Sequence, residues 1–133
     1  FTLGRIEACD KVASVIDALA YDGVLAEGLI SDALVYNCHK RIVVLPRSPD
    51  PAVAREQTDL SINVFDLNYV VISEFWKIEL GILPYPAVEY IKDNPDKFRL
   101  IKTVYEKYNN GIRSNILRDD DTFYIYEIVK RKK

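Results

Sequence analysis

The sequence predicts an α/β fold, a three-layer sandwich in which helices cover both faces of a mostly parallel sheet. Three short, unbroken apolar runs, at 24–26, 42–45 and 69–72, are typical of strands that are buried on both faces. Segments with helical spacing separate these runs, and a helix between successive strands favours parallel pairing through right-handed crossovers. The chain has 133 residues, 49% hydrophobic and 29% charged, so we expect one soluble globular domain spanning 1–133.

Spacing, turn and capping signals define the first three elements. Apolar residues three and four positions apart predict an amphipathic helix over 6–19. The Tyr21-Asp22-Gly23 turn ends this helix, and the first buried strand follows at 24–26. The Ser31-Asp32 pair then supplies a cap for a second helix, which we expect to end near His39.

The middle of the chain contributes two further strands and the helix between them. The second strand, 42–45, is closed by Pro46. Asp50-Pro51 combines an acidic cap with proline at the first helical position, which predicts a third helix that continues to Phe65. The third buried strand follows at 69–72.

The last third of the chain predicts a short helix and two longer strands. The helix covers 86–92, and a strand at 98–105 follows it. After a polar loop over 109–121, strict alternation of residue types indicates a final strand at 122–129. Because no helix separates these two strands, we expect an antiparallel hairpin at one edge of the sheet. The complete predicted order is α-β-α-β-α-β-α-β-β.

The scarcity of cysteine and histidine argues against a metal site. Two cysteines and one histidine cannot supply the roughly four nitrogen or sulfur ligands of a structural zinc ion. Cys9 opens the first helix and Cys38 closes the second, which separates them by on the order of 15 Å, beyond the roughly 7 Å limit for a disulfide. We therefore predict two free thiols. Cys38 and His39 are sequence neighbours and point apart on a helix, which disfavours a nucleophilic pair.

Charge and motif content exclude several classes of protein. A net charge of −2 is unsuited to non-specific binding of nucleic acid. No run approaches the roughly 18 apolar residues of a membrane span. The sequence contains neither a dinucleotide-binding glycine fingerprint nor a phosphate-binding loop, and it lacks the nucleophile elbow of α/β hydrolases. We therefore expect no cofactor and assign no catalytic residue.

Polar residues follow each of the three predicted parallel strands, at the edge where such sheets bind ligands. The candidate ligand-binding residues are Glu27, Ser31, Arg47, Asp50 and Glu74, together with Tyr85, which with Tyr90 forms an exposed aromatic platform beside a proline-rich turn. Two carboxylates and an arginine suit acid–base chemistry or the binding of a sugar or phosphate.

The alternative is that these residues are structural. Ser31 and Asp50 are then helix caps, and the remaining groups are solvated loop side chains. On this interpretation we expect Glu27→Ala and Glu74→Ala each to change the free energy of unfolding by no more than about 0.5 kcal/mol.

Eight segments together carry a resemblance to a known family. They are ACDKVASVI (8–16), VLAEG (24–28), SDALVY (31–36), RIVVLP (41–46), YVVI (69–72), YP (85–86), NPDKFRLI (94–101) and FYIYEI (123–128). In this order they resemble the water-soluble C-terminal domain of polytopic, lipid-phosphate-sugar-dependent glycosyltransferases, the protein-mannosyltransferase and aminoarabinose-transferase-like family.

The resemblance implies an extracytoplasmic accessory domain of a cell-membrane glycosyltransferase, which is not catalytic alone and covers the active site or contributes to acceptor recognition. In that family the catalytic carboxylates and metal contacts lie on loops between membrane helices, so no catalytic residue carries over. The implied partners are the transmembrane part of the same polypeptide and a glycan or protein acceptor. The sequence contains no methionine, and we expect it to be excised from such a membrane protein.

Two alternatives remain at this stage. The chain is a stand-alone small Rossmann-like enzyme, or it is a ligand-binding or regulatory domain. In both cases the site is expected at the C-terminal ends of the parallel strands.

Overall fold

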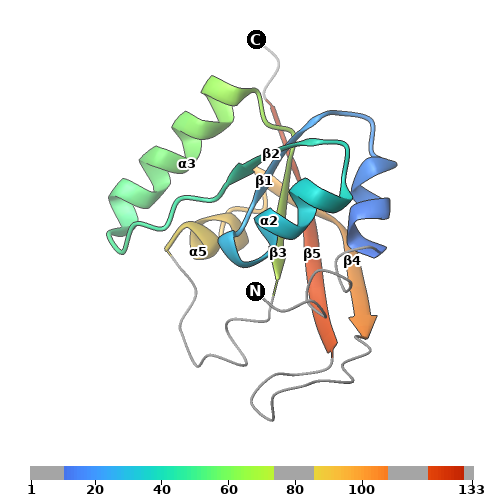
Figure 1. Cartoon of the computed structure of the whole chain (residues 1–133). Helices are drawn as coiled ribbons and strands as arrows, with labels where there is room; N and C mark the ends of the chain where they lie inside the picture. The colour runs from blue at the N-terminus through green and yellow to red at the C-terminus, as the bar shows by residue number, and fades with distance from the viewer. Residues whose placement is uncertain (1–10, 74–85, 108–119, 131–133) are drawn as a thin grey trace.

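The chain folds as an α/β domain, as predicted (Figure 1). The computed structural model describes residues 11–73, 86–107 and 120–130. A helix at residues 11–17 comes first. The elements that follow are β1 (Gly23–Ala26), α2 (Gly28–Asn37), β2 (Arg41–Val44), α3 (Pro51–Phe65), β3 (Tyr69–Ser73), α5 (Pro86–Lys92), β4 (Phe98–Lys107) and β5 (Asp120–Ile128).

The sheet is mixed, which corrects the prediction of a mostly parallel one. Its strand order is β2-β1-β3-β5-β4. Among the described strands, β1 pairs in parallel with β2 and β3, whereas β5 pairs antiparallel with both β3 and β4. The predicted antiparallel hairpin is present, with β4 at the edge.

The sheet is mixed for a simple topological reason. Because β4 and β3 are both antiparallel to β5, they run in the same direction, which the intervening helix α5 permits. The second strand of the hairpin, β5, nevertheless occupies the position between them. The hairpin therefore contributes two antiparallel pairings to the sheet.

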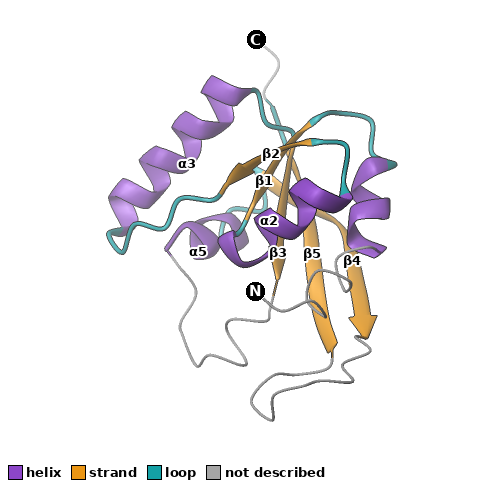
Figure 2. Ribbon diagram, in the orientation of Figure 1, coloured by secondary structure: helices purple, strands orange, loops and turns teal. Residues whose placement is uncertain are grey.

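Helices lie on both faces of this sheet, and each face has its own hydrophobic cluster (Figure 2). The 11–17 helix and α2 pack on one face, where Val24 and Val71 contribute to the cluster. On the other face α3 and α5 pack on Leu25, Val70 and Ile72. Successive residues of β1 and β3 thus enter opposite clusters, which explains why their sequences are continuously apolar.

Two boundaries show which local signals determine the elements. Asp50 caps α3, since its carboxylate accepts hydrogen bonds from the backbone N–H groups of Ala52 (2.9 Å) and Val53 (3.2 Å), as predicted. The predicted start of α2 is wrong: the helix begins at Gly28, directly after β1. Glu27, rather than Ser31 or Asp32, occupies the N-cap position, and its side chain makes no capping hydrogen bond.

Strand β2 also differs from its predicted environment. Its apolar run suggested burial on both faces, but β2 forms an edge of the sheet, and Val44 is 50% exposed. Cys38 is a buried free thiol, and Cys9 lies outside the described residues.

Candidate functional site

The carboxyl ends of β1 and β3 form a topological switch point of the sheet. From β1 the chain continues through α2 to β2, whereas from β3 it continues to α5 and β4 on the other side of these two strands. The two helices lie on opposite faces of the sheet. The connections from β1 and β3 therefore diverge at this edge. In open α/β sheets such a divergence is where ligands bind.

Three of the four buried polar residues in the described part of the chain follow these two strands. Glu27 after β1 is 0% exposed, Ser31 in α2 is 3% exposed, and Ser73 at the end of β3 is 2% exposed. The fourth, Thr58, is satisfied within its own helix, because its hydroxyl donates to the Ala54 carbonyl at 2.7 Å. Buried polar groups are therefore concentrated at the switch point.

The backbone holds Glu27 firmly in this position. Its N–H donates to the Val71 carbonyl at 3.2 Å, which places Glu27 beside the end of β3. Its own carbonyl accepts from the Ser31 N–H at 3.1 Å, which closes the first turn of α2 over the strand end. The Ser31 hydroxyl donates to the Gly28 carbonyl at 3.2 Å. Hydrogen bonds thus connect the end of β1 to both β3 and the first turn of α2.

The burial of Glu27 overturns the interpretation of this residue as a solvated loop group. A carboxylate loses its hydration when it is buried, at a cost of several kcal/mol that specific interactions must offset. The expectation that Glu27→Ala is nearly neutral assumed an exposed side chain, and that assumption is wrong.

The other predicted site residues divide between this edge and other places. Arg47 is exposed, and its Cδ and Nη1 atoms lie 3.9 Å from the position that a Cβ on Gly28 would occupy, so its side chain reaches the start of α2. Asp50 is a helix cap, as the structural alternative proposed. Glu74 and Tyr85 lie outside the described residues.

The Cys38 thiol and the His39 imidazole are remote from the switch point. Cys38 and His39 follow the last turn of α2, whereas Glu27 precedes its first turn. Burial raises the pKa of the Cys38 thiol to about 11, so this group is protonated near neutral pH and is a poor nucleophile. No group of three potential metal ligands occurs in the described part of the chain. Over the same residues, no helix combines the length and apolar character needed to cross a membrane.

A second hollow lies at the opposite edge of the sheet, and the sequence reasoning missed it. Asp59, Asn63 and the C-cap residue Asp66 line it from α3. Lys97 lines it from the turn before β4, and Lys130 lines it from the segment after β5. The spacing of the three α3 residues places them along one side of the helix, which was a usable signal. Tyr90 lies beside this hollow as a half-buried residue with a bonded hydroxyl, so the prediction of an exposed platform is wrong for it.

Comparisons with protein-family models, curated proteins and solved structures found no match to this chain.

Proposed function

We propose that this domain binds a small polar ligand at the carboxyl ends of β1 and β3 and is not catalytic on its own. The observation that supports this proposal is the full burial of Glu27 at the end of β1, beside β3, which itself ends in the buried Ser73. A buried carboxylate at the end of a parallel strand has the character of a binding group.

The chemistry of these side chains favours a ligand rich in hydroxyl or amino groups. An ionised carboxylate only accepts hydrogen bonds, and a serine hydroxyl both donates and accepts. Glu27, Ser31 and Ser73 therefore suit the hydroxyls of a sugar. At the rim, Arg47 offers donors to a ligand carboxylate or phosphate, the groups that guanidinium recognises best.

The wider setting that we propose follows from the resemblance to membrane glycosyltransferases. In this setting the chain is an extracytoplasmic accessory domain at the cell membrane. It packs against the transmembrane part of the same polypeptide, and the polar site contributes to recognition of a glycan or protein acceptor. We also propose that the domain is a three-layer sandwich, which the separate hydrophobic clusters on the two faces of the sheet support.

Nuclear magnetic resonance titration with methyl α-mannoside and with 4-amino-4-deoxyarabinose tests the binding site. We expect saturable shifts of the backbone amides of Gly28, Ser31 and Ser73. Glu27→Gln should weaken binding by about tenfold or more, because a hydrogen bond to a charged group contributes roughly 1.5–3 kcal/mol. The matched control is Glu56→Gln, which removes an exposed carboxylate of α3 and should leave binding unchanged.

Three outcomes of this titration would count against the proposal. They are the absence of any saturable shift, shifts confined to the opposite edge of the sheet, and equal affinity for wild type and Glu27→Gln. Cleavage of the glycoside during the titration would favour a stand-alone enzyme instead.

The membrane setting is tested separately, by reading the gene that encodes this chain. Several apolar segments of about 20 residues in the same polypeptide would support it, since that length spans a bilayer as a helix. A polypeptide without any such segment would overturn it and leave the binding proposal intact.

A further inference from the structure

A cavity of about 440 Å³ lies between the C-terminal half of α3 and the edge of the sheet where β4 starts and β5 ends. Its volume falls within the range of roughly 300–1,000 Å³ that is typical of small-molecule sites. Because β5 runs antiparallel to β3, this edge is opposite the one that carries Glu27 and Ser73. The polar lining residues come from α3 and its C-cap, from the α5–β4 turn and from the segment after β5.

The floor of the cavity is part of the hydrophobic cluster beneath α3 and α5. Ile62, Phe98 and Ile128 line the cavity and are buried members of this cluster. Val129 also lines the cavity and is exposed. An apolar group placed in the cavity would therefore contact apolar side chains and displace water from them, which favours binding.

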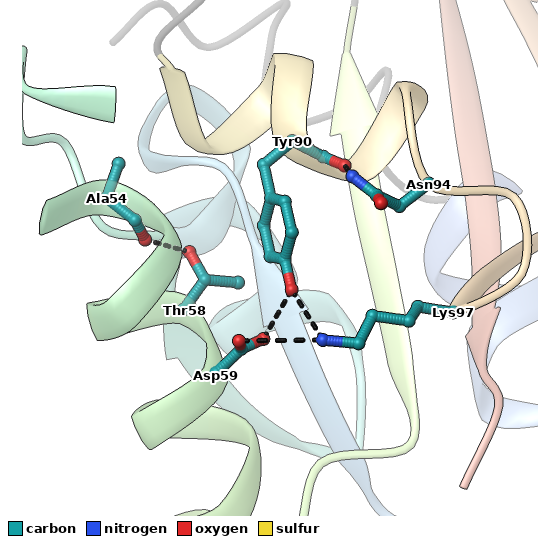
Figure 3. Close-up of polar contacts among 6 residues, drawn as sticks. All are labelled: Ala54, Thr58, Asp59, Tyr90, Asn94 and Lys97. Carbon is teal, nitrogen blue, oxygen red and sulfur yellow. Dashed lines mark hydrogen bonds and ion pairs between the residues drawn. The ribbon is translucent and has the colours of Figure 1, made fainter. Parts of the chain in front are cut away.

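Asp59 and Lys97, which line one side of the cavity, are both bonded to the hydroxyl of Tyr90 (Figure 3). The Tyr90 hydroxyl donates to Asp59 Oδ1 at 2.7 Å and accepts from Lys97 Nζ at 2.8 Å. Lys97 Nζ also lies 3.5 Å from Asp59 Oδ2. The Tyr90 ring packs edge to face on Phe98, with 5.5 Å between ring centroids. Burial raises the pKa of Tyr90, which keeps its hydroxyl protonated and able to donate to Asp59.

A second ion pair closes the other side of the cavity. Lys130, just after β5, donates a hydrogen bond to Asp66 at the end of α3. This interaction lowers the pKa of the Asp66 carboxyl below its ordinary value. The two lysines that line the cavity are therefore each engaged by an aspartate, and neither is available to a third carboxylate.

That third carboxylate is Asp96. It lines the cavity, is exposed, and forms no ion pair within the residues that the structure describes. Three aspartates and two lysines line the cavity, so its wall carries a net charge of −1. A cationic group is attracted to such a wall, and an anionic group is repelled.

We propose that this cavity is a binding site for an organic cation with an apolar body, such as a primary amine. The ammonium group pairs with Asp96, and the apolar body contacts Phe98, Ile128 and Val129. The Tyr90 cluster contributes by holding Lys97 on Asp59, which leaves Asp96 as the carboxylate that the ligand neutralises.

Three ligands that share one apolar body test this proposal: 2-phenylethylamine, 2-phenylethanol and 3-phenylpropionate. Calorimetry and amide shifts of Phe98 and Val129 report binding. We expect the amine to bind up to about fivefold more tightly than the alcohol, because an exposed ion pair contributes little, and a fivefold difference in affinity corresponds to about 1 kcal/mol. The propionate should bind most weakly. The amine's advantage should shrink at high salt, which screens exposed charges.

Asp96→Asn provides the decisive variant. It should reduce the affinity for the amine to that for the alcohol and leave the affinity for the alcohol unchanged. The matched control is Asp93→Asn, which removes an exposed carboxylate in the same turn that does not line the cavity. This control should bind the amine as the wild type does.

Four results would overturn the proposal. They are no binding of the amine, equal affinity for amine and propionate, unchanged amine binding by Asp96→Asn, or equal losses in the Asp93 and Asp96 variants. The amide shifts keep this test separate from that of the polar site, because Ser31 and Ser73 lie at the opposite edge and report the other ligand.

Discussion

Removal of the α3 cap gives a stability change whose size follows from the structure. In Asp50→Ala the backbone N–H groups of Ala52 and Val53 lose the carboxylate oxygen that accepts from them at 2.9 and 3.2 Å. Loss of an N-cap costs about 0.5–2 kcal/mol, and loss of a negative charge at a helix N-terminus adds about 0.3–1 kcal/mol. Because Asp50 is exposed and water can replace part of its bonding, we expect a loss of about 1–1.5 kcal/mol.

Urea denaturation followed by circular dichroism measures this loss as a lower transition midpoint with an unchanged slope. For a chain of this length, thermal unfolding should shift downward by about 3–5 °C per kcal/mol. Asp50→Asn keeps an acceptor at the cap and should lose only about 0.5 kcal/mol, which isolates the contribution of the charge. The titration of Ser31 and Ser73 with sugar should not change in either variant.

Two results would refute this reasoning. A decrease of less than about 0.3 kcal/mol in the free energy of unfolding of Asp50→Ala would mean that the cap contributes almost nothing to stability, contrary to the usual cost of losing a cap. A large loss of sugar affinity with little loss of stability would assign Asp50 to the ligand site, as the sequence alone allowed, and would remove its structural role.

Three further predictions concern other parts of the fold. Gly23→Ala should lower the free energy of unfolding by about 1–3 kcal/mol in urea denaturation, because the new Cβ would lie 2.8 Å from the Asp66 carbonyl oxygen. In Gly28→Ala the new Cβ meets nothing closer than 3.9 Å, so this variant should be neutral or slightly stabilised. Equal effects of the two substitutions would contradict this prediction. Lys130→Ala should return the lowered pKa of Asp66 toward 3.8, which a carboxyl-carbon titration by nuclear magnetic resonance measures. In the wild type, the Lys130–Asp66 pair therefore stabilises the fold fully above pH 3.8 and loses this effect as the pH falls through the lowered pKa. In a Cys9→Ser background, thiol-specific reagents at pH 8 should modify Cys38 about a hundredfold more slowly in the folded than in the unfolded chain. The reason is that burial raises the pKa of the Cys38 thiol from 9.0 to about 11. Similar rates in the two states would show that the thiol is accessible and ionised in the folded chain.

Local sequence signals predicted the elements more fully than their arrangement. The apolar runs of β1 and β3 indicated burial on both faces, and both strands lie inside the sheet. The run in β2 has the same character, but β2 is an edge strand, and an edge position depends on strand order rather than on local composition. The start of α2 was misplaced because the helix follows β1 without a connecting loop, which leaves no room for a separate cap at Ser31.

The candidate site was located from sequence by position but not by environment. The rule that ligands bind after parallel strands placed Glu27 correctly at the carboxyl end of β1. Its burial depends on α2 starting at once and folding its first turn over the strand end, through the bond from Ser31 to the Glu27 carbonyl. Neither residue type nor spacing conveys that packing. Asp50 occupies an equivalent place in the sequence pattern and is an exposed cap.

The position of β5 between β3 and β4, which the sequence did not reveal, also creates the cavity at the edge opposite Glu27. Antiparallel pairing brings the end of β5 back to the start of β3, where the Ile128 N–H donates to the Asn68 carbonyl at 2.8 Å. Lys130 can reach Asp66 only because Asp66 lies just before β3 at this same edge. In a wholly parallel sheet β5 would end at the Glu27 edge, and Lys130 would lie about one strand length away. The strand whose direction distinguishes this sheet from a parallel one therefore supplies one wall of the proposed amine site.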